Sequence, residues 1–217
     1  MAEAGAGAPA MTRLGLIGAG RLGATLLRAA AVHAPQIGLT VASRDASRVA
    51  ALQSEIPRLV AASPEELAGA CDLVVLCVPN DACLSLAERV APHLRADAIV
   101  ISVSNTVPLA AIAERVRVPV VKVIPTLAHV VGRGVALLAA GPGAQPGHVE
   151  AVRSAFAHFS LPLQIDERDA RVASNVAGSA PALFAALCDM FVAANAARAQ
   201  TLDRAALDAM MAETAAA

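Results

Sequence analysis

The sequence lacks tryptophan and tyrosine and has only four phenylalanines among its 217 residues. Aromatic rings on which nucleic-acid bases can stack are therefore almost absent. Charge is also scarce, since charged residues make up 16% of the chain and the formal net charge is −1. A protein without a basic field has no electrostatic means of holding a polyanion. We therefore expect no nucleic-acid partner.

A metal-binding pattern is also missing. The four cysteines are Cys71, Cys77, Cys83 and Cys188, with no C-x-x-C pair and no histidine at zinc-ligand spacing from them. We interpret them as small buried apolar residues in a reducing compartment. This interpretation predicts a cytoplasmic protein without a metal site.

Two segments could be taken for targeting or membrane signals. Residues 1–12 begin with an Ala/Gly-rich stretch that has no basic region and no apolar run, so we expect a disordered tail and not a signal peptide. The segment Ala180 to Ala199 is almost entirely apolar and is close to the length of a membrane-spanning helix. Asp189 lies in its middle and most of its other residues are Ala, so we expect a helix buried against other helices and no membrane partner.

Apolar side chains are abundant, at 57% of the chain. Short apolar runs alternate with helical patterns from residue 13 to residue 165. Apolar strands without polar alternation are typical of strands buried on both faces, and their alternation with helices predicts a mostly parallel, doubly wound sheet in an α/β fold. The expected strands are Arg13–Ile17, Leu39–Ala42, Leu73–Val78, Ala98–Val103, Val118–Ile124, Val135–Ala139 and Leu161–Ile165.

Strand patterns stop after Asp166. The stretch Asp169–Ala199 predicts one long helix or two, interrupted near Gly178–Pro181, and Thr201 would cap a last helix over Leu202–Glu213. Such an apolar tail cannot easily bury its own surface, so it must pack on the first domain or on another subunit. We therefore interpret residues 166–217 as an α-helical dimerisation segment, and we expect a homodimer or a higher homo-oligomer.

A glycine-rich motif follows the first expected strand and opens the first expected helix. It reads Gly18-Ala19-Gly20-Arg21-Leu22-Gly23 and fits G-x-G-x-x-G. In this setting Gly18 permits a tight turn, Gly20 lets the backbone approach a pyrophosphate, and Gly23 lets helix and strand pack closely. The N–H groups at the helix N-terminus would then hold phosphates. The motif predicts that residues 13–165 form a Rossmann-type dinucleotide-binding domain.

The end of the second expected strand indicates which cofactor is bound. An NAD site usually has Asp or Glu there, whereas this chain has Ser43 and Arg44. Hydroxyl and guanidinium groups suit a 2′-phosphate, so we expect NADPH (NADP). The alternative is that Arg44 is a solvated surface charge.

Two later strand ends should also line the cofactor site. In such a sheet the ligand lies outside the carboxyl ends of the strands. We therefore expect the turn Val78-Pro79-Asn80 and residue Ser104 to lie along the path toward the nicotinamide. Asn80 either bonds a cofactor ribose or caps a turn.

The order of these motifs resembles the pyrroline-5-carboxylate reductases over roughly residues 13 to 200. The stretch from Leu16 to Gly23, then Ser43-Arg44 and Val78-Pro79-Asn80, is similar to that family. Four further stretches resemble its R-V-M-P-N-T-P, G-x-G-V, E-x-x-x-D and S-G-S-G-P-A segments: Val121–Thr126, Gly132–Val135, Asp166-Glu167 and Ala177–Ala182.

The resemblance implies an oxidoreductase that reduces a cyclic imine with NADPH in proline biosynthesis. It also implies a Rossmann domain followed by helices that interlock between subunits. Thr126, Leu127 and Ala128 depart from the family's N-T-P. A further family segment resembling D-K-V-T-S-P-G-G-T-T, with a substrate-binding Thr, has no counterpart in these 217 residues. Either the chain is a truncated relative or it acts on another substrate. If it ends at Ala217, we expect NADPH binding with poor turnover of pyrroline-5-carboxylate.

Three residues are candidates for the catalytic half of the site. Ser179 and the backbone around it would grip a substrate carboxylate, if Pro181 opens a helix there. Lys122 is a charge at the end of an apolar strand, and it either bonds a carboxylate or the cofactor or extends to solvent. His129 would donate the proton, because its ordinary pKa suits neutral pH, or it is incidental.

Two other functions stay open. One is an NADP-binding protein of the same fold that does not turn over pyrroline-5-carboxylate. The other is a reductase of a different imine or ketone. Cofactor oxidation with a panel of carbonyl and imine substrates distinguishes these alternatives.

Overall fold

The computed structural model describes residues 12–197 and 203–216. The chain divides into two compact units, residues 1–171 and 172–217. The expected tail, apart from Thr12, and the expected cap Thr201 lie outside the described residues. The strands of the first unit are β1 (Arg13–Ile17), β2 (Gly38–Ala42), β3 (Val60–Ala61), β4 (Leu73–Leu76), β5 (Ile99–Ser102), β6 (Val120–Pro125), β7 (Gly134–Ala140) and β8 (Ser160–Gln164). Its α-helices are α1 (Arg21–His33), α2 (Ala46–Glu55), α3 (Pro64–Ala70), α4 (Asn80–Val90), α5 (Leu109–Ala113) and α6 (Pro146–Phe156).

These strands form one eight-stranded sheet in the order β3-β2-β1-β4-β5-β6-β7-β8. The first six of these, from β3 to β6, are mutually parallel, and β7 is antiparallel to β6. The order 3-2-1-4-5-6 is that of the dinucleotide-binding Rossmann fold. The predicted α/β, doubly wound fold is therefore confirmed.

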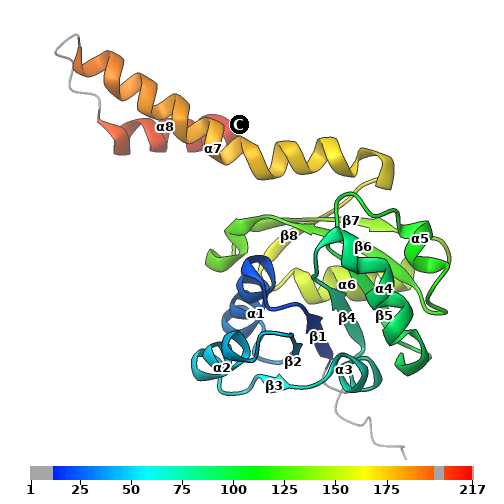
Figure 1. Ribbon diagram of the computed structural model, residues 1–217. Coiled ribbons are helices and arrows are strands. Elements are labelled where there is room, and N and C mark those ends of the chain that lie inside the picture. The colour runs from blue at the N-terminus through cyan, green and yellow to red at the C-terminus, as the bar shows by residue number, and fades with distance from the viewer. Residues whose placement is uncertain (1–11, 198–202, 217) are drawn as a thin grey trace, which may run out of the picture. The chain divides into compact units, whose positions relative to one another are not determined.

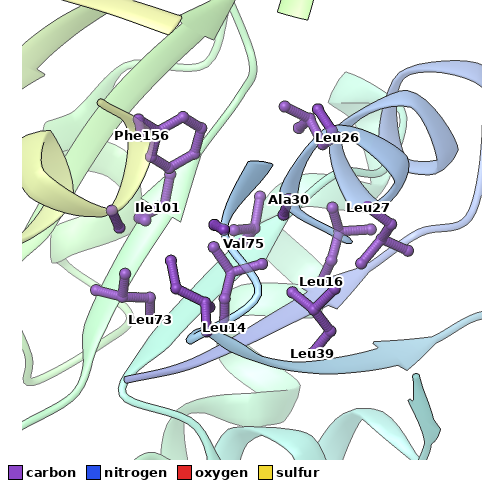
Figure 2. Packing of buried hydrophobic residues seen from close by; sticks show 14 of the residues in the cluster. Leu14, Leu16, Leu26, Leu27, Ala30, Leu39, Leu73, Val75, Ile101 and Phe156 are labelled. Atoms are coloured by element: carbon purple, nitrogen blue, oxygen red, sulfur yellow. The ribbon is translucent and has the colours of Figure 1, made fainter. Parts of the chain in front are cut away.

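Helices cover both faces of this sheet (Figure 1). On one face α1, α2 and α6 pack on β1, β4 and β5. Figure 2 shows this core, with Leu26 and Leu27 of α1 near Leu16 of β1 and with Phe156 of α6 near Ile101 of β5. On the other face α3, α4 and α5 cover a second buried cluster. Both faces of the central strands are buried, and this is why their sequences are apolar without alternation.

Local sequence explains where several helices begin. The Ser63 hydroxyl accepts from the Glu66 N–H, and the Glu66 carboxylate accepts from the Ser63 N–H at 2.8 Å, so α3 starts with a capping box. Asp45 caps α2 by accepting from the Arg48 N–H. Helix α6 begins at Pro146, whose missing N–H is no loss in a first turn.

Both edges of the sheet are interrupted. At one edge β3 has only two residues, and both are exposed. At the other edge lies β8, where Leu161 and Leu163 are exposed on either side of Pro162. Proline has no N–H to donate to a neighbouring strand.

The second unit consists of most of α7 (Ala170–Ala196) and of α8 (Arg204–Ala216). Of the two expectations for α7, one helix is correct, because it continues through Gly178 and Pro181. A proline inside a helix removes one backbone hydrogen bond, and the Ala- and Leu-rich flanks tolerate this loss.

Helix α7 is exposed along most of its length, although its sequence predicts burial against other helices. Apolar side chains on it that face solvent are Val172, Val176, Leu183, Phe184, Leu187, Met190 and Phe191. Among the described residues, Glu167–Ala196 is the one helical stretch long and apolar enough to cross a membrane by length and composition. Apolar side chains of this kind are stable in water only when they are covered.

Candidate functional site

One row of residues crosses the sheet where four strands end. Parallel pairing aligns Ala42 of β2 with Ile17 of β1, Ile17 with Leu76 of β4, and Leu76 with Ser102 of β5. Ser102 in turn pairs with Lys122, although β6 continues to Pro125. The segments that follow these strand ends therefore meet at one edge, which is where ligands bind in open parallel sheets.

The glycine turn after β1 has the geometry that its motif predicts. Gly18 has φ +117°, and a Cβ built on it would meet the Cys77 carbonyl oxygen at 2.0 Å. A Cβ on Gly23 would meet the Gly18 carbonyl oxygen at 2.1 Å. Gly20 has open space where its Cβ would be, and no side chain caps the N-terminus of α1. The turn thus presents unoccupied backbone N–H groups beside free volume, and these suit an anion such as a diphosphate.

Positive charge lies beside this turn. Arg44 follows β2 and is exposed, while Arg48 pairs with Asp45 through a 3.0 Å contact between its Nε and the carboxylate. An open hollow of about 380 Å³ between α1 and α2 is lined by Gly20, Arg21 and Arg48, among others. The Asp45 carboxylate is occupied by the α2 cap and by Arg48, and hydrogen bonds from Ser47 and Arg48 lower its pKa. The segment after β2 therefore presents guanidinium groups to this edge of the sheet, while its one carboxylate, that of Asp45, is already paired.

The turns after β4 and β5 are joined by a hydrogen bond. The Ser104 hydroxyl donates to Asn80 Oδ1 at 2.7 Å and accepts from the N–H groups of Thr106 and Val107. Ser104 is buried, whereas Val78 is half-buried and Pro79 and Asn80 are more exposed. Because the Asn80 oxygen is engaged, its amide N–H groups are the ones that it can offer to a ligand.

Lys122 is held inside the protein and does not extend to solvent. Its side chain is 3% exposed, and Nζ lies 2.8 Å from Glu167 Oε1. Nζ also donates to the Val107 carbonyl oxygen at 3.0 Å. Sequence reasoning missed Glu167 as the partner of Lys122. The only signal for it was the similarity of Asp166-Glu167 to the E-x-x-x-D segment of the resembled family.

His129 is buried in the 3₁₀ turn Leu127–Val131 between β6 and β7. Its ring packs edge-on against Phe159, with ring centroids 6.2 Å apart, and neither ring nitrogen has a hydrogen-bond partner. Burial lowers its pKa to about 4. At neutral pH the ring is therefore uncharged, and it lies in the apolar interior away from solvent.

Ser179 lies in the second unit, exposed in the middle of α7. The expected helix start at Pro181, which would have freed the N–H groups of residues 178–180, is wrong. Inside a continuous helix those N–H groups bond to carbonyl groups of the preceding turn. The Ser179 hydroxyl is what this segment can still offer to a ligand.

Comparisons with known proteins agree with this architecture. The family model described as NADP oxidoreductase coenzyme F420-dependent matches residues 13–106. The chain is 26% identical over 183 residues to ComE operon protein 4 of Bacillus subtilis, covering 83% of this chain and 67% of the relative. It is 30% identical over 190 residues to the pyrroline-5-carboxylate reductase of Mycobacterium tuberculosis, covering 84% of this chain and 64% of that enzyme.

A solved structure shows the same fold. The pyrroline carboxylate reductase of Plasmodium falciparum with NADP bound superposes with a TM-score of 0.72 at 22% identity, over 94% of this chain and 75% of that chain. The chain spans about two thirds of the length of the curated relatives it matches. The chain is thus similar in sequence to pyrroline-5-carboxylate reductases, and it shares the fold of the Plasmodium falciparum enzyme.

Proposed function

We propose that the chain is an NADPH-dependent oxidoreductase that reduces a cyclic imine of the pyrroline-5-carboxylate type, a step of L-proline biosynthesis. The observation that carries this proposal is the glycine turn at Gly18 and Gly20 beside the exposed Arg44, in a chain related to reductases of that imine. Backbone N–H groups suit the diphosphate, and Ser43 with Arg44 suits the 2′-phosphate.

The reaction sets two further requirements. When bound, the cofactor supplies the hydride, so the protein has to orient the C=N carbon against the nicotinamide and hold the substrate carboxylate. Asn80 and Ser104 are suited to the nicotinamide end, because they close the turns after β4 and β5. The Ser179 hydroxyl is the candidate for the carboxylate.

The same proposal covers domains, assembly and compartment. Residues 13–165 would form the NADP-binding domain and residues 166–217 the dimerisation segment of a cytoplasmic homodimer or higher homo-oligomer. The solvent-facing apolar side chains of α7 support self-association, because such a stripe is stable in water only when it is covered.

The direct experiment is steady-state oxidation of NADPH with pyrroline-5-carboxylate, together with titration of NADPH and NADH. We expect imine-dependent oxidation and a preference for NADPH. Absence of NADPH binding would refute the cofactor assignment. Binding without oxidation of any imine or ketone in a substrate panel would refute the enzymatic one.

A second candidate function has its own support. Lys122 is engaged by Glu167, and His129 is fully buried, so neither is free to act on a substrate. These two observations favour an NADP-binding protein of the same fold without turnover. The substrate panel distinguishes this candidate from a reductase of another imine or ketone, because such a reductase would oxidise NADPH with at least one substrate of the panel.

A further inference from the structure

Lys122 is the one Lys, Arg, Asp or Glu side chain that is buried among the described residues. Its register partner Ser102 is the last residue of β5, so Lys122 lies in the row where the neighbouring strands end. Side chains at alternate strand positions share a face, which places Lys122 with Val120 on the face covered by α4 and α5. A lysine here is therefore inside the core, one strand away from the candidate cofactor site.

Lys122 and Glu167 fix the loop between β5 and α5 at its far end. Nζ of Lys122 donates to the Val107 carbonyl, while Glu167 Oε1 accepts from the Leu109 N–H at 2.8 Å. Leu109 is the first residue of α5, so the carboxylate also caps that helix. The two partners of one ion pair thus bind two backbone groups at this end of the loop, the Val107 carbonyl and the Leu109 N–H.

The near end of the same loop is fixed by Ser104. Its hydroxyl accepts from the Val107 N–H at 3.0 Å and donates to Asn80 at 2.7 Å. Val107 is therefore bound on both sides, through its N–H to Ser104 and through its carbonyl to Lys122. A continuous chain of bonds runs from Glu167 and Lys122 to Ser104 and Asn80 at the open edge.

Stability alone does not account for this ion pair. Removing two charges from water is costly, and well-packed apolar residues in place of a buried ion pair are often as stable or more stable. What such a pair supplies is one defined position for the groups that it bonds. Here those groups belong to the loop that carries Ser104.

We propose that Lys122 and Glu167 form a positioning clip that holds the β5–α5 loop, and through it Ser104 and Asn80, in register for the nicotinamide half of NADPH. Neither residue touches the cofactor in this arrangement. The proposal rests on the proposed function and adds to it which residues set the geometry of the nicotinamide end.

The test compares two ligands that share one half. NADPH reports on the whole site, and adenosine 2′,5′-bisphosphate carries the 2′-phosphate but no nicotinamide. For Lys122→Met we expect NADPH affinity to fall about tenfold while bisphosphate affinity stays within about twofold, because only the nicotinamide end loses its positioning. Lys122→Arg should restore NADPH affinity, since it keeps the charge and the donor. Glu167→Gln is a milder variant with the same expected pattern.

Two controls separate positioning from stability. Arg89→Met removes an exposed 2.9 Å pair with Glu65, on the same face of the sheet, and should change neither affinity. The double variant Lys122→Met/Glu167→Leu removes both charges and should recover the thermal midpoint of wild type without recovering NADPH affinity. Recovery of both would mean that the pair acts only on stability, and would overturn the proposal.

Different results would overturn the positioning clip and the proposed function. Normal NADPH binding by folded Lys122→Met would overturn the clip alone. Failure of the wild-type chain to bind NADPH would overturn the proposed function, and the role of the clip with it.

Discussion

At the scale of single residues, we expect Arg44 to set the preference between the two nicotinamide cofactors. It follows β2 where an NAD site carries an acid, and it is exposed. We expect Arg44→Ala to weaken NADPH binding by about 1.5 to 3 kcal/mol, the range for a hydrogen bond to a charged group, and to leave NADH binding nearly unchanged. Fluorescence titration of both cofactors measures this. Arg117→Ala, at an exposed position before β6, is the matched control, and equal losses for both cofactors would contradict the assignment.

His129 makes stability depend on pH. Burial lowers its pKa to about 4, so below pH 6.5 the unfolded chain binds more protons at this residue than the folded chain. The free energy of unfolding therefore falls as the pH drops from 6.5 toward 4, by about 2 kcal/mol at pH 5. We expect His129→Leu to remove most of this dependence in urea unfolding at pH 7.5 and pH 5. His93→Gln, at an exposed position, should retain it.

At the scale of elements, the capping box of α3 is a local source of stability. Ser63 and Glu66 satisfy one another's backbone N–H groups in a seven-residue helix. We expect Ser63→Ala to lower the free energy of unfolding by about 1 kcal/mol, as measured in urea. Ser85→Ala is the control, because that hydroxyl bonds a carbonyl inside α4 and caps nothing. Equal effects of the two substitutions would show that the box does not stabilise α3.

Helices and strands were predictable where several consecutive residues carry an apolar pattern. Very short elements were not predictable in this way. The apolar runs of β1, β4 and β5 were predicted close to their observed bounds. Strand β3, with two residues, and helix α5, with five, were not, because each is held by its neighbours and not by its own periodicity.

The same distinction applies to the candidate site. The glycine turn and Ser43-Arg44 are contiguous in sequence and were predictable. The Lys122–Glu167 pair and the Ser104–Asn80 bond join residues far apart in sequence, which meet only through the register of the sheet. The burial of His129 against Phe159 is likewise a tertiary property, so its neighbours in sequence do not reveal it.

At the scale of the whole molecule, the expected self-association tests the α7 surface. Leu183, Phe184, Leu187 and Phe191 share one stripe at helical spacing, and each is at least 39% exposed. We expect sedimentation velocity at micromolar concentration to show a dimer or larger, and we expect Phe184→Asp to shift it toward monomer. Ala193→Asp, away from that stripe, should leave it associated. A monomeric wild-type chain would contradict the prediction.

The interrupted edges of the sheet bear on what kind of aggregate the chain can form. A long free edge strand is a template on which other chains add strands without limit, as in fibrils. Here one edge is two residues long, and the other has Pro162 within it, so neither presents an unbroken ladder of donors and acceptors. Growth by strand addition is thereby discouraged at both edges. Association through the apolar stripe of α7 would therefore not be accompanied by open-ended strand addition at these edges.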